Sequence, residues 1–143
     1  MSGDSGSIRI AMDIDQHNQW FISLFVLVNG VLKPVRFKID TGCNALVLSH
    51  KTLQRLGKPT DTSTLSKLPE LSGKLASGEK NIFKKLGNVT LFQDSKQSVQ
   101  ICNANVICHA TKQTNNLLGT EVLHQFAGVS FRIKGNKYLE LSK

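Results

Sequence analysis

Short apolar runs alternate with polar residues along most of the chain, at the period of two that is typical of β-strands. Two of the clearest runs, Trp20–Val28 and Val31–Ile39, meet across Asn29-Gly30, the residue pair most typical of a tight β-hairpin. From Val35 onward apolar and basic residues alternate strictly. This alternation predicts a strand with one face in the core and the other in water.

Further strands are predicted over residues 46–48, 71–75, 80–86, 89–92, 99–107, 128–133 and 137–141. Ser49 is expected to cap a brief helix that ends at Gly57, and Thr120 to cap a second one. Residues 60–69 are polar and rich in turn formers, which predicts a loop. Short strands at this spacing predict an all-β, closed, barrel-like fold with one or two short helices.

A chain of 143 residues has room for one domain with a proper core. We assign residues 17–143 to that domain and residues 1–16, rich in Ser, Gly and Asp, to a flexible N-terminal arm. The first residues do not resemble a signal peptide, and no apolar run reaches the roughly 20 residues that cross a bilayer. We therefore expect a cytoplasmic or otherwise intracellular protein.

The net charge is +8, and the basic residues are scattered rather than interleaved with aromatic ones. A solvated basic surface is the simplest interpretation. Nucleic acid is an unlikely partner on this pattern, while an attraction to acidic substrates stays open. The odd set of three cysteines and the four scattered histidines lack metal-ligand spacing, so we expect reduced thiols, no metal and no cofactor.

The triplet Asp40-Thr41-Gly42 follows the alternating strand directly, and the apolar stretch Ala45–Leu48 comes after it. A carboxylate at the end of a buried strand sits where low dielectric and a fixed backbone can tune its proton affinity. Gly42 lets backbone N–H groups approach that carboxylate. The chain has one such loop in a convincing setting. Acid–base chemistry would therefore need a second carboxylate from another copy, which predicts a homodimer.

The segment Phe37–Asn44 resembles the active-site segment of the retropepsin-like aspartic proteases, which are single-lobed and dimeric. Two further features follow in the order typical of that family. Lys74–Lys80 is similar to its flexible hairpin, the flap, and Leu117-Leu118-Gly119 precedes a short helix. The resemblance covers residues 18–143 and implies a retropepsin fold.

The resemblance also implies an aspartic endopeptidase that acts on extended peptide or polyprotein substrates. In that mechanism a water molecule is activated between the two Asp40 carboxylates of the dimer. Thr41 would lock the two loops together across the axis, and Gly42 would orient the carboxylates. The remaining implied positions are structural support from Leu117, Leu118 and Gly119, substrate contact at the flap tip by Ala76, Ser77 and Gly78, and a shared terminal sheet that includes Tyr138–Leu141.

Alternative interpretations stay open. Gly78 is equally suited to an ordinary hairpin. Cys43 stands where the family more often has Ala or Ser, and it is either a small buried side chain or a site of thiol oxidation. The chain as a whole could be a catalytically weak dimerisation or peptide-binding module. A basic nucleic-acid-binding β-barrel is a third interpretation, which steep salt dependence of binding would reveal.

Overall fold

Strands make up most of the molecule. The computed structural model describes residues 7–74, 80–109 and 115–143. The strands in these residues are β1 (Ser7–Ile14), β2 (Trp20–Val28), β3 (Val31–Ile39), β4 (Leu46–Val47), β5 (Glu70–Lys74), β6 (Lys80–Phe92), β7 (Gln100–His109), β8 (Leu117–Leu118), β9 (Gly128–Arg132) and β10 (Tyr138–Ser142). The helices are α1 (His50–Arg55), α2 (Thr62–Leu65) and α3 (Thr120–Leu123).

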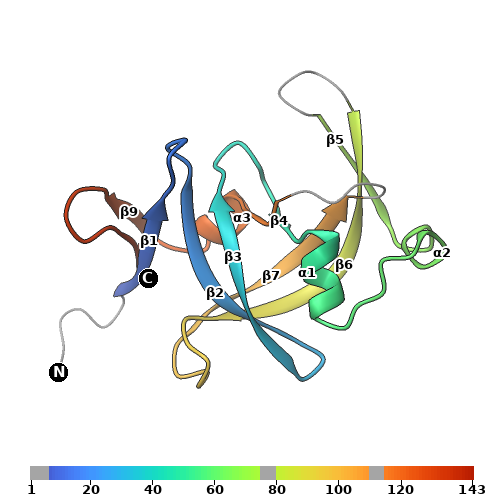
Figure 1. Ribbon diagram of the computed structural model, residues 1–143, viewed down its shortest axis with the longest axis horizontal. Coiled ribbons are helices and arrows are strands. Elements are labelled where there is room, and N and C mark those ends of the chain that lie inside the picture. The colour runs from blue at the N-terminus through green and yellow to red at the C-terminus, as the bar shows by residue number, and fades with distance from the viewer. Residues whose placement is uncertain (1–6, 75–79, 110–114) are drawn as a thin grey trace.

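Six of the strands close into a barrel, in which the long strands β2, β3, β6 and β7 form the wall (Figure 1). The order around the ring is β2, β3, β8, β4, β7 and β6, and β6 closes it by pairing with β2. The pairs β3–β8 and β4–β7 are parallel, whereas the other four are antiparallel. The expectation of an all-β, closed, barrel-like fold is therefore confirmed, although the described residues form three short helices where one or two were expected.

The β2–β3 hairpin has the bounds that the residue pattern predicts. Asn29 and Gly30 both have positive φ, of 48° and 80°, as a two-residue hairpin turn of the primed type requires. Phe37, in the alternating part of β3, is fully buried, and its neighbours Arg36 and Lys38 lie toward the other face. Apolar side chains from every strand of the barrel wall fill its interior. One face of β3 therefore belongs to the core, and the other lies outside it.

The N-terminal strand β1 adds a second small sheet to the barrel. Its first half pairs with β10, its second half pairs with β2, and β9 covers the far edge of β10. Ile8, Ile10 and Met12 point inward and are buried. The prediction of a flexible arm over residues 1–16 is thus wrong for residues 7–14, because their alternating apolar side chains bury one face. Residues 1–6 lie outside the described part of the chain.

The position of β10 also corrects an expectation about assembly. Both backbone edges of β10 are occupied within its own chain, by β1 on one side and β9 on the other. The predicted contribution of Tyr138–Leu141 to a sheet shared with a second copy is therefore not supported. The free edge of this sheet belongs to β9, where Val129 is 36 % exposed.

Three local predictions differ from the structure. The loop expected over residues 60–69 contains α2, because Asp61 caps it by accepting a hydrogen bond from the backbone N–H of Thr64. Hydrogen bonds from the hydroxyls of Ser63 and Thr64, together with that N–H, lower the pKa of Asp61 to about 2.

The two strands expected over residues 80–92 are one strand, β6, with a bulge between Lys85 and Gly87.

The cap of α3 differs as well. Thr120 is the first residue of the helix rather than its cap, and the N-cap position is occupied by Gly119, which has no side chain to cap with. In the described part of the chain, none of the helices is long and apolar enough to cross a membrane.

The packing of β1 gives a test of its place in the fold. Replacing Ile10 by Ala removes apolar atoms from a buried site, so we expect the free energy of unfolding to fall by about 2–4 kcal/mol. Urea unfolding measures this loss. The neighbouring exposed residue gives the control, because Ala11→Ser should change stability by less than about 0.5 kcal/mol. Equal stability of both variants would mean that β1 is a detached arm.

Candidate active site

The carboxylate of Asp40 lies directly after β3, where the chain turns away from the barrel wall. The backbone N–H of Asp40 donates to the carbonyl oxygen of Leu118 at 3.1 Å, which fixes the turn to β8. The N–H of Gly42 donates to Asp40 Oδ1 at 3.0 Å, and the N–H of Cys43 donates to the Asp40 carbonyl at 3.1 Å. Asp40 is half-buried, whereas Thr41 and Gly42 are exposed. Among the described residues, Gly42 is the one donor to this carboxylate, so Oδ2 is left for a further partner.

The back of this loop rests on Gly119, and there is no space between them. A Cβ placed on Gly119 would lie 2.5 Å from the carbonyl oxygen of Ala45, and it would also meet the carbonyl oxygen of Cys43. Two hydrogen bonds join the loop to α3 at the same place. Thr120 N–H donates to Cys43 O at 2.9 Å, and Glu121 N–H donates to Asn44 O at 2.8 Å. Only glycine permits this close approach of two backbones.

Leu117 and Leu118 form β8, which lies between β3 and β4. Leu118 is buried at 1 % exposure, and Leu117 is half-buried. Together with Gly119 they lie behind the loop of Asp40. The structure thus brings together two of the three predicted segments, although they are far apart in the sequence. The third, the flap tip Ala76, Ser77 and Gly78, lies outside the described residues.

Asn116 holds the same region together, and the residue pattern alone did not indicate it. Its side-chain oxygen accepts from the backbone N–H of Ser49 at 2.8 Å, and its side-chain nitrogen donates to Arg36 O at 3.2 Å. Its own carbonyl accepts from Lys38 N–H at 2.9 Å. One side chain therefore ties β3, the start of α1 and β8 together. Its position directly before Leu117 is the only signal in the sequence that could have indicated this role.

Cys43 follows the triplet and is half-buried. Burial raises the pKa of its thiol, with a smaller contribution from the negative charge of Asp40. Its Sγ donates to the carbonyl oxygen of Ala45 at 3.5 Å. Burial likewise raises the pKa of Cys102, to about 11, and that of Cys108. The three thiols are therefore protonated at neutral pH, which suits small packed side chains better than nucleophiles.

No group of three or more metal-ligating side chains occurs within the residues that the structure describes. One hollow of about 370 Å³ is lined mainly by residues of β1 and β2, and another of about 280 Å³ lies between β3 and α1. Neither is lined by Asp40, Thr41 or Gly42. The candidate carboxylate is half-buried and lies outside both hollows.

Comparisons with known proteins agree with this geometry. The aspartyl protease family matches residues 25–122, which include Asp40 and Gly119. A crystal structure of a retropepsin-like aspartic protease from Rickettsia conorii is similar, with a TM-score of 0.57 and 25 % sequence identity. The similarity covers 95 % of this chain and 89 % of that one. A comparison with curated protein sequences gives no significant match.

The contact between Gly119 and the Asp40 loop gives a second prediction. In Gly119→Ala the new methyl group meets backbone atoms that cannot rotate away, so we expect a loss of about 1–3 kcal/mol or more in the free energy of unfolding. Urea unfolding provides the measurement. Gly128→Ala is the matched control, because its Cβ would lie 3.5 Å from Ser142 Cβ, an ordinary contact. If both variants were equally stable, the close approach would not constrain the loop.

Proposed function

Because this chain belongs to the aspartyl protease family, in its retropepsin-like branch, we propose that it is an aspartic endopeptidase that acts as a homodimer. Its substrates would be extended peptides or polyproteins. The observation that carries this proposal is the position of Asp40, a half-buried carboxylate at the open end of β3 with one oxygen held by Gly42 N–H. One carboxylate is half of the required pair, and a second copy supplies the other.

The chemistry follows from bringing two Asp40 side chains close together. Two carboxylates a few ångströms apart do not both ionise at low cost, so the pair holds one proton. Aspartic proteases are the standard example of this behaviour. The ionised carboxylate, as general base, takes a proton from a water molecule that attacks the peptide carbonyl. The protonated one donates to the carbonyl oxygen and then helps to protonate the leaving amine.

The residues around Asp40 would serve this chemistry by fixing its position. Gly42 N–H holds one carboxylate oxygen, and Leu118 fixes the backbone of Asp40. Thr41 is exposed beside them and would contact its counterpart across the two-fold axis. Leu117, Leu118 and Gly119 would support the loop from behind without touching the substrate.

The substrate would lie in an extended conformation between the two Asp40 loops and the two flaps, bound by main-chain hydrogen bonds. The hairpin of β5 and β6 leads to the segment that would form the flap, with Ala76, Ser77 and Gly78 at its tip. Closure of such a hairpin excludes water from the site. No metal or cofactor takes part in this proposed mechanism.

The decisive substitution is Asp40→Asn, which keeps the shape of the side chain and removes its proton chemistry. We expect the rate of peptide cleavage at pH 4–7 to fall by about 10²–10⁴-fold or more, the contribution typical of general acid–base catalysis. Mass spectrometry of a peptide library gives the readout. Asp61→Asn is the matched control, because Asn caps a helix as well as Asp and the position lies outside the site. Cleavage that survives Asp40→Asn would exclude this mechanism.

The proposed dimerisation also predicts the activity of mixtures of wild-type and Asp40→Asn chains. If each site needs one Asp40 from each chain, an equal mixture of wild type and Asp40→Asn chains that exchange freely keeps about a quarter of its dimers fully wild type. The activity per wild-type chain should then fall to about half, and dilution should lower the specific activity. Light scattering at the same concentrations measures the oligomeric state. Activity that is independent of both mixing and dilution would show that a single chain suffices.

A protein that dimerises but cleaves no peptide would contradict the endopeptidase proposal. It would favour the second candidate function, a retropepsin-like module that binds peptides or mediates dimerisation. The observation that keeps this candidate open is Cys43, whose half-buried thiol follows the triplet and packs against the Ala45 carbonyl.

A further inference from the structure

A hollow of about 280 Å³ lies between β3 and α1, beside the strand that leads to Asp40. Three basic residues line it, Arg36 from β3 and Lys51 and Arg55 from α1. Asn115 and Asn116 also line it. Among the described residues, no acidic one lines it. We call this feature the basic hollow.

We propose that the basic hollow binds an acidic side chain of the peptide substrate, a few residues away from the bond that is cut. This inference rests on the proposed function and specifies its substrate class. Asp40 would carry out the cleavage, whereas the basic hollow would determine which peptides bind.

The charge of the hollow favours an anion. Lys51 and Arg55 are both exposed at its rim, and Arg55 uses one N–H to donate to the carbonyl oxygen of Pro34 at 3.1 Å. A guanidinium has five donors, so several stay available for a carboxylate. Within the described part of the chain, Asp13 is the one acidic group paired with this cluster, through Arg36 at 2.8 Å. The cluster of three cations and one anion therefore keeps a net positive charge.

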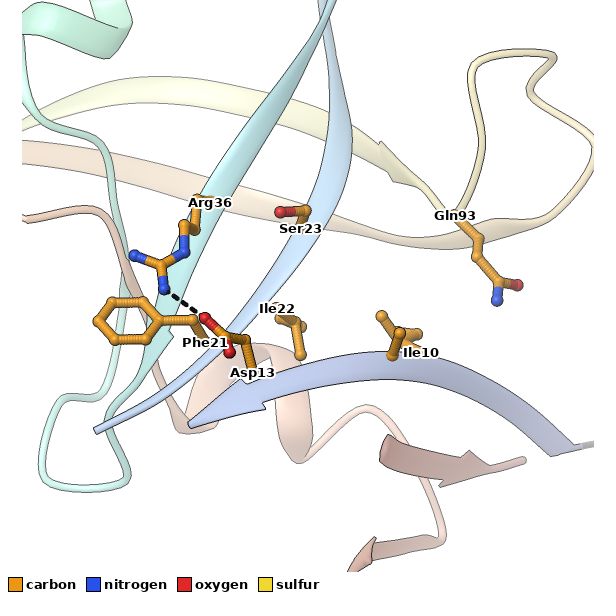
Figure 2. Close-up of a pocket in the computed structure, with 8 residues that line it drawn as sticks. Ile10, Asp13, Phe21, Ile22, Ser23, Arg36 and Gln93 are labelled. Carbon is orange, nitrogen blue, oxygen red and sulfur yellow. Dashed lines mark hydrogen bonds and ion pairs between the residues drawn. The ribbon is translucent and has the colours of Figure 1, made fainter. Parts of the chain in front are cut away.

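Two contacts within the chain orient Arg36. Its guanidinium stacks on the ring of Phe21, 3.7 Å above the ring centre, and contacts Asp13 from the side (Figure 2). The stacked guanidinium covers one face of Phe21, the aromatic residue that lines the hollow. That arrangement suits a carboxylate, which needs oriented donors, better than a nucleobase, which needs a free aromatic face.

The basic hollow lies at a useful distance from the candidate carboxylate. Arg36, Lys38 and Asp40 alternate along the end of β3, with Phe37 turned into the core between them. Four residues of strand span about 13 Å at 3.3 Å per residue, which separates Arg36 from Asp40. An extended substrate advances by the same distance per residue. Its acidic side chain would thus stand about three to five residues from the cut bond.

The size of the hollow fits this role. Sites for whole drug-sized ligands occupy about 300–1,000 Å³, so 280 Å³ suits a single side chain with its water better than a complete small molecule. Asn115 and Asn116 connect the hollow directly to Leu117 at the start of β8. A side chain held there would therefore lie beside the segment that supports the Asp40 loop.

Cleavage of matched peptides tests the proposal. A library carries Glu, Gln or Lys at each of five positions on either side of the cut bond. We expect wild type to cleave the Glu peptide about tenfold better than the Gln peptide at one position, since a few exposed ion pairs contribute about this much. The double variant Lys51→Glu/Arg55→Glu should lose this preference and favour Lys at that position.

The control reverses two exposed lysines elsewhere, Lys96→Glu/Lys134→Glu, so that the net charge changes equally. This control should keep the preference for Glu. A preference lost in both variants, or absent from wild type, would overturn the proposal. If the double reversal unfolds in urea earlier than wild type, Lys51→Gln/Arg55→Gln replaces it, with loss of the Glu preference expected and its retention contradicting the proposal.

A binding experiment separates this proposal from the proposed function. Asp40→Asn protein is titrated with fluorescein-labelled hexaglutamate and hexaglutamine, and anisotropy reports binding. Hexaglutamate should bind about tenfold more tightly, and Lys51→Glu/Arg55→Glu should abolish the difference while the lysine control keeps it. Equal binding of both peptides would overturn the proposal even if cleavage depends on Asp40. Tighter binding of oligo-dT at the same residues would overturn it in favour of nucleic acid.

Discussion

The backbone contact between Gly119 and residues 43–45 is the constraint on which the rest of the site depends. It joins two segments that are distant in the sequence. Their backbones lie so close together in space that no side chain fits between them. The loop of Asp40 is thereby held from behind by backbone atoms, which have no rotamers to change. Hydrogen bonds from Thr120 and Glu121 close the same junction. In the proposed dimer, a carboxylate that meets its partner within hydrogen-bond reach would need a stiff support of this kind.

The outer face of β3 has a second role, which its core-facing residues make possible. Phe37 anchors the strand in the barrel, and this leaves Arg36 and Lys38 on the face that continues to Asp40. Asn116 then ties this strand to the start of α1, where Lys51 and Arg55 lie. The strand that positions Asp40 thus also positions the positive charge beside it. In the proposed function, reactivity and recognition would both depend on this strand.

Much of this organisation is readable from the residues, and the failures have physical reasons. The Asn29-Gly30 turn and the cap at Ser49 are local signals, and both were predicted correctly. The strand over residues 7–14 was missed because the polar first residues outweighed three alternating apolar side chains. The bridging role of Asn116 depends on contacts with residues about 67 and 80 positions away, which no local pattern carries. The barrel and the family followed from order and spacing, whereas the basic hollow required the three-dimensional contacts.

The pairing of β1, β10 and β9 within one chain has a consequence for how the protein can be controlled. The terminal strands exchange their hydrogen bonds inside a single molecule, so a lone chain does not have to borrow a strand to complete its sheet. In the proposed dimer, folding and association would then be separate thermodynamic events. Surface substitutions would change how tightly two molecules bind without disturbing the fold of either. The concentration of the protein would thereby control its activity.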